Sequence, residues 1–234
     1  MNTNISPEMQ AKLSGLRLTR YSNDTREEGM TALEAVAMLA GEEHSDYPDT
    51  CCPAIASTVR SLNWLLSDEE RAQLLPLLPL LVGSKSTPEV EMKRRWHLLD
   101  AQIRDVIPAI LETSDLPGVK EWAGKLRGLE KIADEITARR SRDVISSFAN
   151  FLEWLPWSRA LDLALDLARA LARALALDLA RDLDLALDLA RALALDLARA
   201  LDRARALDRD LALARKATIE KSITAIKGAL EITS

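Results

Sequence analysis

The segment HSDYP at residues 44–48, followed by CCP at residues 51–53, carries the side chains best suited to chemistry. Imidazole, carboxylate and thiolate groups all bind metals, so His44, Asp46, Cys51 and Cys52 could together form a metal site. Their spacing matches no common zinc pattern, and the sequence contains no Cys-x-x-Cys pair. We therefore predict no metal and no cofactor at this segment.

Three other interpretations of the segment stay open. It could line a pocket for a polar small molecule, with His44 and Asp46 as binding residues. His44 with Cys51 or Cys52 could be drawn as a thiol dyad, although nothing else in the sequence supports nucleophilic catalysis. It could also be a plain helix-to-helix loop, in which Asp46 or Asp49 caps a helix and the cysteines pack as small hydrophobic residues.

The two cysteines also bear on location. Adjacent cysteines rarely bridge each other because the disulfide geometry is strained. Reduced thiols are typical of a cytoplasmic protein, which is the location we predict. The first ten residues, MNTNISPEMQ, lack the basic and apolar regions of a secretory signal.

A second group of candidate residues is the basic segment Lys93-Arg94-Arg95-Trp96-His97. Arg94 and Arg95 could contact phosphate groups, and Trp96 could stack on a base. The alternative is an ordinary solvated helix face. The net charge of −5 argues against a general nucleic-acid binder, so a nucleotide or another small molecule is the ligand class that this segment favours.

Catalytic signatures are missing from the sequence. It contains no GxxxxGK[ST], GxGxxG, HExxH or GxSxG motif. We therefore predict that the protein is not an enzyme.

Composition predicts an all-α fold. Of the 234 residues, 48% are hydrophobic, only 4% are aromatic and only 8 are glycine, and there are no β-branched runs. No stretch of about 18 uncharged apolar residues exists, so we predict no membrane partner.

Residues 1–156 are predicted to form an N-terminal multi-helix bundle. Capping boxes at Thr31–Glu34 and Ser67–Glu70 mark two helix starts, and Pro53 suits the first turn of a helix over 53–66. The apolar run LLPLLPLLVG is expected to pack inside despite its prolines. Further helices are predicted over 88–111, with a kink at Pro108, over 119–139 and from 142. The helix predicted over 119–139 rests on the helical spacing of five apolar residues, which are Trp122, Leu126, Leu129, Ala133 and Ile136.

Residues 157–234 contain a low-complexity repeat that we predict to be helical. The heptapeptide LALDLAR occurs four times between residues 163 and 199, and the run from 161 to 215 has no Gly, Pro or β-branched residue. Ala, Leu and Arg favour helix. A straight helix over this region would be roughly 100 Å long, so it either breaks into antiparallel segments or is covered by a second copy. We predict a homo-oligomer or another protein partner, contacted through the repeat leucines Leu167, Leu179, Leu189 and Leu197.

The segment TALEAVAMLAGEEHSDYPDTCCPAIA, followed by LSDEERAQLLPLLPLLVG, resembles a group of uncharacterised helical proteins of phages, prophages and bacterial genomes. Members of that group also end in long Ala-rich tails. The resemblance covers roughly residues 31–83 and implies a phage setting, in which small non-enzymatic proteins bind host factors. It carries over no catalytic residue. The expected function is therefore a non-enzymatic interaction protein that binds a host defence protein. The alternative is a protein that sequesters a small molecule or nucleotide through the 44–52 loop and the basic residues.

Overall fold

The structure, a computed structural model, describes residues 7–23, 28–112, 118–153, 187–192 and 210–233. These residues confirm the all-α prediction, because they contain helices and only a single isolated bridge between Leu18 and Met30. The chain divides into two compact units, Met1–Arg94 with Ile226–Ser234, and Arg95–Ala225. Among the described residues, no helix is both long enough and apolar enough to span a bilayer.

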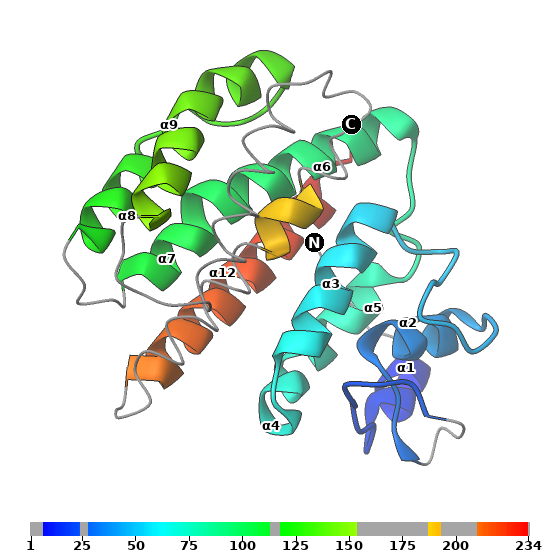
Figure 1. Cartoon of the computed structure of the whole chain (residues 1–234). Coiled ribbons are helices and arrows are strands. Elements are labelled where there is room, and N and C mark those ends of the chain that lie inside the picture. Colours follow the sequence, from blue (N-terminus) through cyan, green and yellow to red (C-terminus); the bar gives the residue numbers. More distant parts are fainter. Residues whose placement is uncertain (1–6, 24–27, 113–117, 154–186, 193–209, 234) are drawn as a thin grey trace. The chain divides into compact units, whose positions relative to one another are not determined.

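The first unit is built around three helices. Helix α2 (Ala32–Ala40) packs against α3 (Pro53–Leu65) and against α5 (Leu78–Leu81) (Figure 1). Helix α1 (Pro7–Leu13), helix α4 (Asp68–Arg71) and the 3₁₀ helix η2 (Ala72–Leu77) belong to the same unit. Its core consists of apolar side chains that are almost fully buried, among them Leu33, Val36, Ile55, Val59, Leu74, Leu77, Leu78 and Leu81.

Both predicted capping boxes are confirmed. The Thr31 hydroxyl accepts a hydrogen bond from the Glu34 N–H (3.2 Å), and the Glu34 carboxylate accepts one from the Thr31 N–H (2.8 Å). Ser67 and Glu70 repeat this exchange at the start of α4. Pro53 occupies the first turn of α3, where a missing N–H costs nothing. These local signals therefore set where the helices of the first unit begin.

The prediction that LLPLLPLLVG packs inside is also confirmed. Its leucines at 74, 77, 78 and 81 are buried, while Pro76 lies in the 3₁₀ helix and Pro79 in the first turn of α5. A 3₁₀ helix followed by a new α-helical turn accommodates the missing N–H groups of both prolines.

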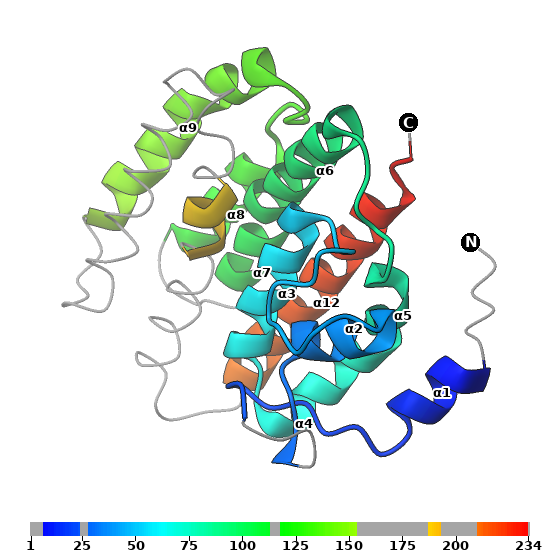
Figure 2. The same ribbon diagram turned by 90° about the vertical axis from the view of Figure 1, so that its right-hand side faces the viewer.

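The second unit contains α7 (Ile107–Glu112), α8 (Val119–Arg127) and α9 (Glu135–Glu153), in which α8 packs against both α7 and α9 (Figure 2). Helix α6 (Pro88–Ala101) continues into α7 through a π-helical turn, η3 (Gln102–Val106). The Ile107 N–H bonds to the Gln102 carbonyl across this wide turn. Pro108 has no N–H to offer the Arg104 carbonyl, and the π turn lies just before this proline, where the sequence predicts a kink.

The single helix predicted over 119–139 is wrong. Helix α8 ends at Arg127, next to Gly128, and α9 begins at Glu135, so that the helix predicted from 142 is the later part of α9. The new start is fixed by Asp134, whose side chain accepts a hydrogen bond from the Thr137 N–H (2.8 Å). Ile136, expected on the apolar face, is 62% exposed. Helical spacing of apolar residues continued by chance across a glycine and a new N-cap.

The repeat is described only at residues 187–192 and from Asp210 onward, and both parts are helical, the second as α12 (Asp210–Glu231). Leu187 and Ala190 are buried, Leu189 is half-buried, and Asp188 pairs with Arg191 at 2.7 Å. Leu167, Leu179 and Leu197, like the predicted boundary between residues 156 and 157, lie outside the described residues. The continuous repeat helix, its oligomer and that boundary stay predictions.

Candidate functional site

The loop between α2 and α3, residues 41–52, is held in place by its own side chains. Gly41, in the left-handed conformation at φ 77°, ends α2 and turns the chain. The Glu42 carboxylate then accepts hydrogen bonds from the backbone N–H groups of Asp49 (2.7 Å) and Thr50 (2.9 Å). These bonds join the beginning of the loop to its end, just before α3 starts.

Asp46 ties the middle of the loop to both flanking helices. Its carboxylate accepts a hydrogen bond from the hydroxyl of Thr31, the residue that caps α2 (2.6 Å), and another from Nε of Arg60 on α3 (2.8 Å). Nη2 of Arg60 also donates to the Asp46 carbonyl (2.5 Å). The guanidinium lies over the Tyr47 ring, 4.1 Å from its centroid. This arrangement fixes the position of Arg60 and presents Tyr47 on the surface.

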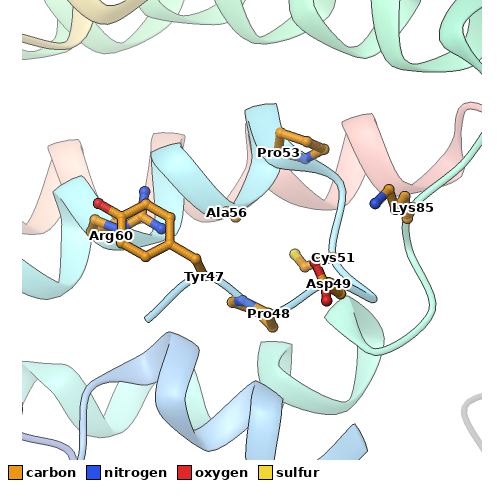
Figure 3. Close-up of a pocket in the computed structure, with 8 residues that line it drawn as sticks. All are labelled: Tyr47, Pro48, Asp49, Cys51, Pro53, Ala56, Arg60 and Lys85. Carbon is orange, nitrogen blue, oxygen red and sulfur yellow. The ribbon is translucent and has the colours of Figure 1, made fainter. Parts of the chain in front are cut away.

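Next to this loop lies a pocket of about 290 Å³, whose described lining is Tyr47, Pro48, Asp49, Cys51, Pro53, Ala56, Arg60 and Lys85. Figure 3 shows Tyr47 and Arg60 together at one end and Lys85 at the other, with the first turn of α3 between them. Lys85 is brought there by the backbone, since its N–H donates to the Thr50 carbonyl (2.9 Å).

The pocket favours negative charge. Two cationic side chains, Arg60 and Lys85, line it beside one acid, Asp49. Arg60 is also paired with Asp46, so Lys85 is the lining cation for which the described ranges show no ion pair. The N-terminus of α3 also lies here, where the Cys52 side chain makes no cap and the first turn contains no acid. The Cys52 N–H is bonded to Ser84, and Pro53 has no N–H, so the terminus contributes mainly through the helix dipole. The partial positive charge of a helix N-terminus attracts anions. Cations and helix terminus together suit a phosphate or carboxylate group.

The thiol of Cys51, which lines the pocket, is kept neutral. Burial raises the pKa of this thiol from 9.0 to about 11, although a hydrogen bond from the Ser84 hydroxyl to Sγ (3.5 Å) acts in the opposite direction. Cys52 is fully buried, and its N–H donates to the Ser84 Oγ (3.0 Å). Only thiolates are strong nucleophiles, so Cys51 is inert near neutral pH.

We expect alkylation of native Cys51 by iodoacetamide at pH 7 to be at least a hundredfold slower than that of an exposed cysteine, because far less thiolate is present. The rate should rise about tenfold per pH unit between pH 7 and pH 9.5, since the thiolate fraction grows until the pKa is reached. Peptide mass spectrometry measures the rate at each cysteine, with Cys51→Ser as the control for reaction at Cys52. A rate that levels off near pH 8.5 would contradict the raised pKa of Cys51.

The structure separates the residues that sequence patterns grouped together. His44 lies outside the pocket, with Nε2 3.3 Å from the buried carboxylate of Glu34, and Asp46 serves to fix the loop. Arg94 is 4% exposed and donates hydrogen bonds to the carbonyls of Ser84 and Ile232. Arg95 and Trp96 are half-buried and do not belong to the described lining of the pocket.

The sequence pointed to the correct loop but missed the residues that give the pocket its charge. Arg60 could have been found, because it lies two helical turns after Pro53 on the predicted helix over 53–66. Lys85 follows the apolar run at a turn, and nothing in its sequence surroundings links it to residues 44–52. The packing of α5 against α2 brings it near the loop.

The site holds no cluster of metal-binding groups. Across the described ranges, no three His, Cys, Asp or Glu side chains are grouped so as to bind one metal ion. No hydrogen bond or ion pair in those ranges joins His44 to Cys51 or Cys52. The comparisons with protein family models, with curated proteins and with solved structures find no match to this chain. The resemblance to phage-encoded helical proteins therefore stays an expectation, and the geometry of the pocket is the main guide to function.

Proposed function

We propose that the protein binds a small organic anion and performs no chemistry on it. The observation that carries this proposal is the pocket at the start of α3, where Arg60 and Lys85 line one cavity beside the first turn of the helix. Anions bind at helix N-termini because backbone N–H groups and the helix dipole point outward there.

The size of the pocket narrows the class of ligand. Pockets for drug-sized molecules range from about 300 to 1,000 Å³, so a cavity of about 290 Å³ suits a compact metabolite. The apolar side of the pocket, formed by Pro48, Pro53 and Ala56, can cover a small hydrocarbon part, while the cations bind one or two acidic groups. A whole nucleotide would fit only in part, with its base left on the surface near Tyr47.

A role in binding without catalysis is supported by the state of the pocket's only thiol. The Cys51 sulfur is protonated near neutral pH, and the His44 imidazole is paired with Glu34. A thiol dyad would need the imidazole within hydrogen-bond reach of the sulfur.

We expect a dicarboxylate, or inorganic pyrophosphate as a compact probe with two acidic groups, to stabilise the full chain in a thermal unfolding experiment. At a ligand concentration of 100 times Kd the gain is about 2.7 kcal/mol. Lys85→Ala should weaken binding by about tenfold, because it removes one of the two cations of the pocket. Lys131→Ala, at an exposed lysine of the second unit, is the matched control and should bind like the parent.

The panel should contain inorganic phosphate, pyrophosphate, succinate, citrate and ATP at constant ionic strength, with Kd measured by calorimetry. Stabilisation that is equal for Lys85→Ala and Lys131→Ala would show only a general salt effect and would refute the pocket as an anion site. Tighter binding of ATP than of every compact anion would point instead to the sequestering of nucleotides.

Protein binding through the repeat remains a second proposal. It rests on the sequence of the repeat. In the helical segment at 187–192, Leu187 and Ala190 are buried within this chain, so a partner would have to contact the half-buried Leu189 there. A surface of alternating aliphatic and paired charged side chains is typical of helix-to-helix association. The phage origin, the host defence partner, the homo-oligomer and the cytoplasmic location stay expectations that depend on the sequence alone.

A further inference from the structure

Three aromatic residues of the first unit are exposed. Tyr47 is 74% exposed, Tyr21 63% and Trp64 45%. Exposed aromatic rings that gather on one surface are a common mark of an interaction site, whereas single exposed apolar residues are normal. The question is whether these three residues form one surface.

Two arginines join two of these residues, Tyr47 and Trp64, into a continuous strip. Arg60 lies 4.1 Å from the Tyr47 ring centroid, and Arg20 lies 5.7 Å from that of Trp64. Arg60 and Trp64 are four residues apart in α3, so their side chains are neighbours on one face of the helix. We call Arg20, Tyr47, Arg60 and Trp64 the α3 aromatic strip.

The part of the strip that precedes α2 is anchored by a buried side chain. The Asn63 amide donates hydrogen bonds to the carbonyls of Thr19 (3.0 Å) and Arg20 (3.3 Å), and its oxygen accepts one from the Ala32 N–H (3.2 Å). Residues 19–21 are therefore held along α3. A fixed backbone reduces the entropy that a partner would have to remove on binding.

We propose that the α3 aromatic strip is a docking surface for an acidic segment of another protein. Tyr, Trp and Arg are the residues that most often dominate the binding energy of protein interfaces. Here they alternate on a surface that the described chain leaves open to solvent.

Charge complementarity specifies the acidic character of the partner. Within the described ranges no acid lies within ion-pair distance of Arg20, although the charge of Arg20 acts on the exposed carboxylate of Asp68. Arg17 lies 3.9 Å from Asp68, with both side chains 72% exposed. Arg60 uses Nε and Nη2 on Asp46, which leaves Nη1 as a donor. Carboxylates placed between the two cation–π pairs would satisfy these donors.

A single-stranded nucleic acid is the less favoured partner. Each phosphate that such a strand presents must be neutralised by a cation, and tight binding needs many contacts of this kind. The strip offers two arginines, one of which is already paired with Asp46. The chain as a whole has a net charge of −5, which repels a polyanion.

The test is a selection of random displayed 16-residue peptides on the full-length protein, followed by fluorescence anisotropy with the enriched peptides. We expect enriched peptides to have a net negative charge and to bind more weakly as salt is raised. Trp64→Ala should weaken binding by at least tenfold and Arg20→Ala by about fivefold. Lys131→Ala is the matched control, and circular dichroism verifies that each variant keeps its helical content.

Three results would overturn the proposal. Enriched peptides without a negative charge would refute the acidic character of the partner. Equal binding by Trp64→Ala and the parent would refute the strip as the binding surface. Arg20→Glu serves as a second variant if Trp64→Ala loses helical content, and unchanged binding by it would have the same meaning. Competition by a 20-nucleotide oligothymidine with the same loss in Trp64→Ala would assign the strip to nucleic acid. These outcomes are independent of anion binding, because Trp64 and Arg20 do not line the pocket.

Discussion

Replacing Arg71 with alanine is expected to lower the free energy of unfolding by about 3–5 kcal/mol, the largest effect of any single polar residue in the first unit. Arg71 is 1% exposed, and its guanidinium bonds to carbonyl groups at the C-terminal end of α3. Nε donates to the Asn63 carbonyl (2.9 Å), Nη2 to the Leu66 carbonyl (2.5 Å) and Nη1 to Asp68 (2.5 Å). Alanine would leave two buried carbonyls without a donor, together with a cavity.

Urea titration followed by circular dichroism measures this loss. Arg71→Lys should recover only a small part of it, because an ammonium group cannot reproduce the planar fork that bonds three acceptors at once. Arg139→Ala is the control, since Arg139 forms an exposed pair with Glu135 within one helix and should change stability by less than about 0.5 kcal/mol. A loss below about 1 kcal/mol for Arg71→Ala would show that water replaces the guanidinium at the end of α3.

Helix starts in the first unit were predictable because each depends on residues close together in the sequence. Thr31 and Glu34 exchange two hydrogen bonds within four residues, and Pro53 marks the first turn of α3 by its fixed φ. Such signals act before any tertiary contact forms, and the structure confirms them.

Apolar periodicity was less reliable because it says nothing about breaks. The spacing of Leu126, Leu129 and Ile136 fits one helix. However, α8 ends at Arg127, and Asp134 caps a new helix by accepting a hydrogen bond from the Thr137 N–H. A capping residue that follows a glycine should therefore outweigh a continuing apolar pattern. The repeat at 161–215 has neither glycine nor a capping Ser, Thr or Asn, so its sequence gives no comparable guide.

The charge of the candidate site could be predicted only in part. The loop at 44–52 was visible because it groups reactive residue types, but His44 and Asp46 act within the protein, on Glu34 and Arg60. Lys85 reaches the pocket through a backbone bond to Thr50, a contact over more than thirty residues. Such distant pairings depend on how α5 packs, which no local pattern encodes.

Replacing Arg94 with alanine is the second large effect, an expected loss of about 2–4 kcal/mol in the free energy of unfolding. Arg94 lies in the basic segment that suggested a phosphate site, but its side chain is buried and donates to the carbonyls of Ser84 and Ile232. Ser84 in turn holds the Cys52 N–H at the start of α3. Arg94 therefore holds Ser84, which contacts the start of α3 next to the pocket, and it bonds Ile232 to the rest of the first unit.

Lys93→Ala is the matched control, because Lys93 is the exposed neighbour in the same helix and should change stability by less than about 0.5 kcal/mol. Arg94→Ala should also weaken pyrophosphate binding, but only in proportion to the loss of folded protein, and binding should return at temperatures where the variant is fully folded. An Arg94→Ala variant that is as stable as the parent and yet binds pyrophosphate tenfold more weakly would instead make Arg94 a ligand-binding residue. That result would support the phosphate-binding role that the basic segment predicts for Arg94. It would also mean that Ser84 keeps its position without the Arg94 guanidinium.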